Sequence, residues 1–184
     1  MSLLGLFALG LFLGARTAGG ADHAWQTQLV TLLRQQSQLR DGRSLLGNVA
    51  AYLNHDILFL LAAYLLGLCA AGLPLLLLLP LLRGLGLGVV SGWLYFSEGL
   101  RGLGYSILVQ YPAAVISMLI LLAAAKEGML MAGDMLLTVT GKQERVESGI
   151  RMYSLRFLVL AVLCVPAALL DALCFSAFSG LFAS

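Results

Sequence analysis

Long apolar segments separated by short polar ones run through most of the chain. A helix that crosses a membrane needs about 20 apolar residues, because the hydrocarbon core is roughly 30 Å thick and a helix rises 1.5 Å per residue. The segment 57–96 carries a single charge, Arg83, and would be about 60 Å long as a helix, which is enough for two spans. The pattern predicts a first membrane helix over 1–15 and further spans over 52–71, 74–96, 104–125 and 157–182.

The break between the second and third spans is expected at Gly72 and Pro74. Gly72 relaxes the backbone, and proline suits the first turn of a helix because its missing N–H has no partner there in any case. The two spans would therefore form a tight antiparallel hairpin. The polar turn 97–103 then leads to the next span.

The first polar section, residues 16–44, follows an apolar helix that a signal peptide could also explain. The charged start and the Ala-x-Ala site of a signal peptide are missing, so the sequence favours a membrane helix. Residues 24–39 have an amphipathic pattern, which fits either a helix at the membrane surface or under a partner, or packing against the protein's own spans. Its apolar stripe includes Trp25, Leu29, Leu32 and Leu33.

The core membrane domain, residues 45–184, includes a charged section over 126–156. Basic residues collect on cytoplasmic segments, so this section is predicted to be cytoplasmic and the C-terminus external. The section 16–44 then lies outside, although its own arginines argue against that orientation.

Composition supports a membrane protein and limits the other classes. Of 184 residues, 60% are hydrophobic and 11% are charged, with mean hydropathy +0.95, whereas a soluble domain has about a quarter of its residues charged. The predicted fold is all-α, a polytopic integral membrane helix bundle of about five transmembrane helices plus amphipathic interfacial helices. The net charge of +2 is too small to indicate nucleic-acid binding. The three cysteines lie in apolar runs and fit small buried residues.

No pattern of catalytic or metal-binding residues emerges. A phosphate-binding loop is missing, and no cluster of His and Cys has the spacing of metal ligands, so neither cofactor nor metal is expected. Ser91 lies between valine and glycine, but an intramembrane serine protease would need a glycine at position 89 and a histidine deep in a span. His55 and Asp56 are interpreted as the polar entrance of the second span. The sequence therefore predicts a protein that is not an enzyme.

Two charges lie within predicted spans, Arg83 and Asp171. A charge at the middle of a membrane costs about 2.5–3.5 kcal/mol on insertion scales, and pairing would offset part of that cost. The predicted depths of the two residues differ by about 8 Å, which an arginine side chain can largely reach across. A structural pair is favoured over a substrate or proton path, and snorkelling of Arg83 to the surface is a third possibility.

Small residues recur every four positions in the third span, at Gly84, Gly88 and Gly92, with Ser91 beside them. That spacing places them on one helix face, where missing side chains let another backbone approach closely. Packing inside the protein is favoured over homodimerisation for this face.

The chain resembles the stage II sporulation protein M family. The resemblance covers roughly residues 45–130 and rests on an asparagine-containing helix entry, a Gly-x-Pro hairpin break, a long aliphatic run, an Arg-Gly step and a glycine-rich continuation. These are Tyr52-Leu-Asn54-His-Asp, Gly72-Leu-Pro74, Arg83-Gly84 and the glycines at 86, 88 and 92, followed by Tyr111-Pro112 in the next span.

The resemblance implies a multi-pass protein of the cell (inner or cytoplasmic) membrane that serves as a non-enzymatic scaffold during engulfment. Its implied partners are the stage II sporulation proteins D and P, which degrade peptidoglycan at the septal membrane. The surfaces expected to contact partners are the 24–39 helix and the 97–103 turn, and a homo-oligomer is possible. The alternative is a permease-like subunit of a transporter, with 126–156 docking a cytoplasmic ATPase and Arg83 and Asp171 in the path.

Overall fold

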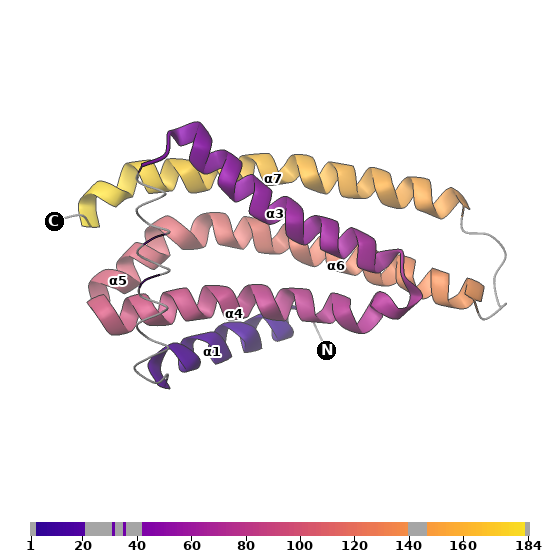
Figure 1. The fold of residues 1–184 in the computed structure, drawn as a ribbon, viewed down its shortest axis with the longest axis horizontal. Helices are drawn as coiled ribbons and strands as arrows, with labels where there is room; N and C mark the ends of the chain where they lie inside the picture. The colour runs from indigo at the N-terminus through magenta and orange to yellow at the C-terminus, as the bar shows by residue number, and fades with distance from the viewer. Residues whose placement is uncertain (1–2, 21–30, 32–34, 36–41, 140–146, 183–184) are drawn as a thin grey trace.

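The protein folds as an elongated bundle of helices (Figure 1). The structure is a computed structural model and describes residues 3–20, 31, 35, 42–139 and 147–182. The long helices within these ranges are α1 (Leu3–Gly20), α3 (Leu45–Gly67), α4 (Leu73–Glu98), α6 (Tyr111–Val139) and α7 (Glu147–Phe182). Shorter elements join them: η1 (Ala70–Gly72), α5 (Leu100–Tyr105) and the π-helix η2 (Ser106–Gln110).

Helices α3, α4, α6 and α7 run alternately in opposite directions along the bundle (Figure 1). Helix α1 runs parallel to α4, because Gly10 lies against Leu81 and Gly19 lies against Phe96. The last turn of α1, the start of α3 and the junction of α4 with α5 therefore share one end of the bundle (Figure 1). The α3–α4 turn lies at the opposite end.

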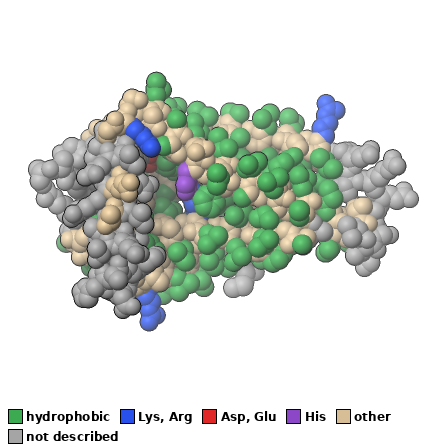
Figure 2. Space-filling model, viewed as in Figure 1, with side chains coloured by type: hydrophobic (Ala, Val, Ile, Leu, Met, Phe, Trp, Pro, Cys, Tyr) green, Lys and Arg blue, Asp and Glu red, His purple; other side chains and the backbone are tan. Residues whose placement is uncertain are grey.

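Four of the described helical segments are long and apolar enough to cross a membrane. Figure 2 shows green apolar side chains over most of the middle of one face, with most visible charged side chains towards its ends. The remaining apolar helix, α1, is shorter than these four. The prediction of an all-helical polytopic membrane protein is confirmed, as four candidate spans plus a short apolar N-terminal helix.

Most of the second predicted span, 52–71, lies in a helix that begins before it. Helix α3 begins at Leu45, where the Ser44 side chain accepts a hydrogen bond from the Gly47 backbone N–H (3.2 Å) and so satisfies one of the free donors of the first turn. The helix ends at Gly67, and η1 leads directly into α4. Asp56 thus lies halfway along α3 and not at its entrance.

The hairpin turn between α3 and α4 lies at the predicted glycine and proline. Gly72 precedes α4, and a Cβ atom there would collide with the backbone carbonyl of Leu66, so a larger residue would force the turn apart. Pro74 stands in the first turn of α4, where it leaves no intrahelical hydrogen bond unmade. The turn can be tight because Gly72 has no side chain to collide with Leu66 and Pro74 is compatible with the first turn of a helix.

The charged section after the fourth span continues as helix on both sides of residues 140–146. Helix α6 passes through Lys126 and Glu127 to Val139, and α7 already includes residues 147–156. Arg156 donates a hydrogen bond to the Glu127 carboxylate across the two helices, which helps to pair their charged turns. The predicted boundaries at 125 and 157 thus mark a change of polarity, whereas the helices themselves extend further.

Helix α6 is preceded by the π-helix η2, and Pro112 stands just after it. Proline has no backbone N–H and cannot donate to the carbonyl four residues earlier, so the chain adopts a wider turn before it. The turn leaves the Ser106 side chain completely buried. The predicted single span over 104–125 is therefore built from three consecutive helical pieces.

The apolar core fills the half of the bundle nearest the α3–α4 turn. Tyr153 of α7 is its most polar member, and its hydroxyl donates to the backbone carbonyls of Tyr64 (3.0 Å) and Ala63 (3.4 Å). Its ring stacks on Tyr64, with centroids 5.2 Å apart, and also contacts Phe157. These contacts satisfy carbonyls near the end of α3 and attach that end to α7.

Helices α1 and α4 pack with their backbones unusually close. A Cβ atom added at Gly84 or Gly88 would collide with carbonyl oxygens of α1, and one added at Gly10 or Gly14 would collide with carbonyl oxygens of α4. Gly92 completes the row, since a Cβ atom added there would lie only 2.9 Å from the Ala15 Cα. Lipid offers no hydrophobic gain for helix association, so such close backbone contact supplies the packing energy instead.

Candidate functional site

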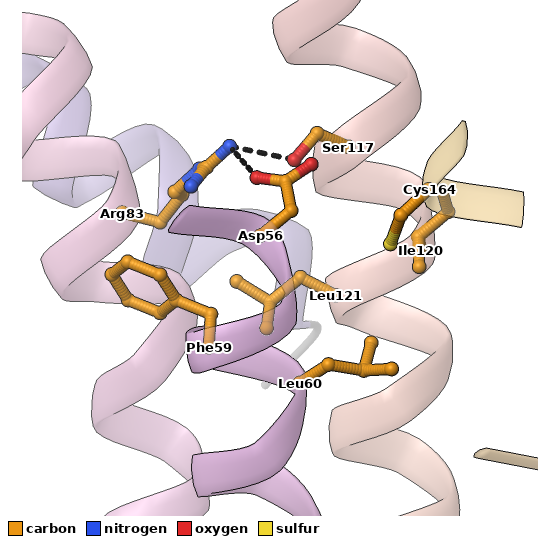
Figure 3. A pocket seen from close by; sticks show the side chains of 8 residues that line it. All are labelled: Asp56, Phe59, Leu60, Arg83, Ser117, Ile120, Leu121 and Cys164. Carbon is orange, nitrogen blue, oxygen red and sulfur yellow. Dashed lines mark hydrogen bonds and ion pairs between the residues drawn. The ribbon is translucent and has the colours of Figure 1, made fainter. Parts of the chain in front are cut away.

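A buried arginine brings three helices together in the middle of the bundle. Arg83 of α4 is 8% exposed, and its Nη2 donates to Asp56 Oδ1 on α3 (2.7 Å) and to Ser117 Oγ on α6 (2.6 Å). Figure 3 shows the three side chains pointing towards one another. This cluster of Arg83, Asp56 and Ser117 is called the charge cluster below. Each of its hydrogen bonds connects a different helix to α4.

Asp56 is the acid that the structure places against Arg83, whereas the sequence pointed to Asp171. The sequence analysis interpreted His55 and Asp56 as a polar helix entrance, and that interpretation is wrong, because α3 begins three turns earlier and Asp56 is 5% exposed. Asn48, Tyr52 and Asp56 recur every four residues in the sequence. This periodicity is the signal that could have identified the inward polar face of α3.

His55 extends the charge cluster to the surface of α3. Its Nδ1 lies 2.7 Å from Arg83 Nη1, and because a guanidinium only donates, Nδ1 accepts and the imidazole proton is on Nε2. The side chain of His55 is 61% exposed, and its ring contacts Phe59. The Phe59 ring in turn lies 5.3 Å from Arg83 Cζ, in range of a cation–π contact. Three of the side chains around the guanidinium, His55, Asp56 and Phe59, therefore come from α3.

A small cavity of about 10 Å³ adjoins the charge cluster. Its walls combine the three polar side chains with Phe59, Leu60, Ile120, Leu121 and Cys164 (Figure 3). This volume is at the lower limit for one water molecule. Asp56 Oδ2 is buried and receives no hydrogen bond from the described residues. The cavity has no room for a substrate larger than water.

Asp171 is also buried, at 2% exposure, and lies on α7 in the half of the bundle that includes Asn48 and Tyr52. Tyr52 lies within electrostatic range of Asp56, Arg83 and Asp171. The described contacts of Arg83 go to Asp56, Ser117, His55 and Phe59. A direct contact between Arg83 and Asp171 stays a prediction.

The other predicted site residues fall into two groups. Gly84, Gly88 and Gly92 face α1, and the nearby Ser91 is buried with its hydroxyl donating to the backbone carbonyl of Leu87 (2.8 Å). This bond returns to its own helix, as a packing serine does. The second group, Trp25, Leu29, Leu32 and Leu33 of the predicted amphipathic helix, lies outside the described residues.

Sequence reasoning missed the small residues of α1. Gly10, Gly14 and Ala18 also recur every four positions and form the surface that receives α4. The same spacing rule that identified the α4 face would have marked these residues as a helix-packing face, although not α4 as its partner.

The chemistry of the charge cluster is that of a structural ion pair. Its hydrogen-bonding groups are used to join α3, α4 and α6, and an ion pair in this position removes an uncompensated charge from the membrane. Among the described residues, no group of three or more His, Cys, Asp and Glu side chains is arranged to hold a metal ion.

The fold and the charge cluster together define a polytopic helical membrane protein with charged groups built into its helix contacts. The model of the family Stage II sporulation protein M matches residues 3–178. The chain belongs to this family, which makes it a sporulation-family membrane protein. No curated protein and no solved structure matches the chain.

Proposed function

We propose that the protein is a non-enzymatic membrane scaffold of the sporulation engulfment machinery. In this function it anchors peptidoglycan-degrading partners, the stage II sporulation proteins D and P, at the septal membrane. The observation that carries the proposal is the family match over residues 3–178, which includes α1, α3, α4 and α6 and all but the last four residues of α7.

The charge cluster supports a scaffold better than a transporter. A transport path needs polar groups around a space that can hold a substrate, whereas Arg83 is engaged by three polar partners and Phe59 beside a cavity of about 10 Å³. The half of the bundle beyond it is filled by the apolar core around Leu76 and Ala124. Charges that are paired in this way hold the helices in one arrangement, which favours a scaffold over a transporter.

A candidate contact surface lies where α4 meets α5, within and beside the predicted 97–103 turn. Gly99 adopts a φ of 61° there, a conformation that side chains disfavour, so the chain turns sharply. Leu100 is 81% exposed and stands beside Tyr95 and Phe96, which are also exposed. An exposed apolar patch that includes an aromatic residue such as Tyr95 is typical of a surface that protein partners contact.

The test is affinity capture of the tagged full-length protein from sporulating membranes, followed by identification of the captured proteins. The proposal expects both peptidoglycan-degrading proteins, with capture reduced at least about fivefold by Leu100→Ser. Met152→Ser is the matched control, because Met152 is also exposed but lies in the first turns of α7, at the opposite end of the bundle. Capture with this variant should equal wild type.

Two outcomes would overturn the proposal. Recovery of an ATPase without any peptidoglycan-degrading protein would favour the permease-like subunit. Equal losses for Leu100→Ser and Met152→Ser would place the contact surface elsewhere.

A further inference from the structure

The outward face of α3 carries two polar side chains halfway along a membrane span. Asn54 and His55 are both exposed, and they lie within one turn of the middle of Leu45–Gly67. Hydrocarbon cannot satisfy an amide or an imidazole N–H, so such groups in a span are expected to face a protein partner or a polar space. These two side chains therefore mark a surface that something other than lipid covers.

The hydrogen-bonding groups left over on this face can be assigned atom by atom. Arg83 uses His55 Nδ1, which leaves the Nε2–H of His55 as an outward donor. Among the described residues, no hydrogen bond reaches this donor or the Asn54 amide. The amide supplies one acceptor oxygen and two donor hydrogens. The face thus presents both donors and an acceptor at the same depth.

The surroundings of Asn54 have the period of a helix-pairing seam. Outward positions follow each other at alternating steps of four and three residues, which is the 3.5-residue repeat of paired helices. The members are Gly47, Ala51, Asn54, Leu58, Leu61 and Leu65. The last three are more than half exposed, and the first two are small enough to let a second backbone approach.

We propose that this face of α3 binds the same face of a second copy of the protein, with a two-fold axis along the membrane normal. In a membrane, two copies share one orientation, so each residue near the axis meets its counterpart at the same depth. The Nε2–H of His55 can then donate to the Asn54 amide oxygen of the partner, and the reverse pair forms by symmetry. A second copy always supplies a His55 donor and an Asn54 acceptor at the same depth in the membrane. For this reason we propose a second copy as the partner and not another membrane protein.

The proposed contact also connects the surface to the charge cluster. Arg83 fixes the His55 tautomer that presents a donor outward, and Asp56 holds Arg83 in place. Association of two copies would therefore rest on the same residues that join α3 to α4.

The test is disulfide crosslinking of the full-length protein in lipid vesicles, where no other protein is present. Leu61→Cys reports on the seam, in a background where Cys69 and Cys174 are changed to serine and the buried Cys164 is kept. Leu119→Cys is the matched control, since Leu119 is exposed to a similar extent but lies on α6. The proposal expects a crosslinked dimer at position 61, at least about fivefold more than at position 119.

Asn54→Leu should then lower the crosslinked fraction about tenfold across a lipid-dilution series, as expected for loss of two interhelical hydrogen bonds. Asn54→Gln should retain most of it. Asn54→Leu leaves the charge cluster untouched, so the monomer should stay folded, which its elution as a sharp monodisperse peak would verify.

Equal crosslinking at 61 and 119, or an unchanged dimer in Asn54→Leu, would overturn the proposal. Crosslinking in native membranes to a different protein, with no dimer, would do the same.

Discussion

The Arg83 guanidinium donates to the Asp56 carboxylate at 2.7 Å, with both side chains buried between membrane helices. The two residues come from adjacent helices of the hairpin, and Ser117 adds a third helix to the same nitrogen. Removing either charge leaves the other without compensation in a region of low dielectric. Replacing one residue of the pair should therefore destabilise the bundle more than replacing both with apolar residues.

Asp56→Ala should unfold the bundle at a lower denaturant concentration than wild type. The change leaves Arg83 buried without its acid, and breaking a buried pair in this way costs about 3–5 kcal/mol. The measurement is the unfolding free energy from SDS titration in mixed micelles. Asp134→Ala is the control, because Asp134 is exposed on α6 and should cost little. Equal losses of unfolding free energy for both variants would show that the buried Asp56 contributes no more to stability than an exposed acid does.

Ser117→Ala should destabilise the bundle less than Asp56→Ala. It removes one hydrogen bond from Arg83 and leaves the ion pair in place, and interhelical hydrogen bonds in membranes average about 0.6 kcal/mol with a maximum near 1.7. The same SDS titration measures it. A loss as large as that of Asp56→Ala would mean that Ser117, and not the charge, holds α6 to α4.

Gly88→Leu should separate α1 from α4. A side chain at Gly88 would collide with the Leu11 backbone, which cannot move without shifting the helix, so a loss above the usual 1–3 kcal/mol of overpacking is expected. The readout is protease accessibility of α1 in membrane vesicles. Gly86→Leu is a close control on the same helix, because a Cβ at Gly86 meets nothing within 4 Å. Cleavage that is the same for both variants would contradict the close packing.

Tyr153→Phe should weaken the end of the bundle near the α3–α4 turn by about 1 kcal/mol, the usual net value of one hydrogen bond. The phenyl ring preserves the contacts with Tyr64 and Phe157, so only the hydroxyl is tested. Hydrogen exchange of the last turn of α3 should rise. Tyr95→Phe is the control, because the Tyr95 side chain is exposed and its hydroxyl bonds to no described residue. Unchanged exchange in Tyr153→Phe would show that the hydrogen bonds to Ala63 and Tyr64 do not stabilise the end of α3.

Much of the fold follows from local rules that the sequence displays. Apolar length predicts spans, and Gly72 with Pro74 predicts the turn, because both depend on backbone chemistry within a few residues. The face formed by Gly84, Gly88 and Gly92 is visible for the same reason. Which helix it contacts depends on long-range packing, and α1 emerges as the partner only in three dimensions.

The partner of Arg83 could not be chosen from depth alone. Depth along the third and fifth predicted spans made Asp171 a suitable acid, but the comparison left out Asp56, which was interpreted as the entrance of the second span, 52–71. The cap at Ser44 adds two turns at the start of α3, and this moves Asp56 from the membrane surface to the middle of the span. Placing the start of the span two turns inside this helix therefore left Asp56 out of the choice of partner for Arg83.

The most direct test of this account is a pair of double-mutant cycles in the unfolding free energy. One cycle combines Arg83→Leu with Asp56→Leu, and the other combines Arg83→Leu with Asp171→Leu. The account predicts a coupling energy of about 2–3 kcal/mol for Arg83 with Asp56 and a smaller one for Arg83 with Asp171, because direct contact such as that of Arg83 with Asp56 is the main source of coupling. A larger coupling for Arg83 with Asp171 would contradict the assignment of Asp56 as the acid that holds the hairpin together.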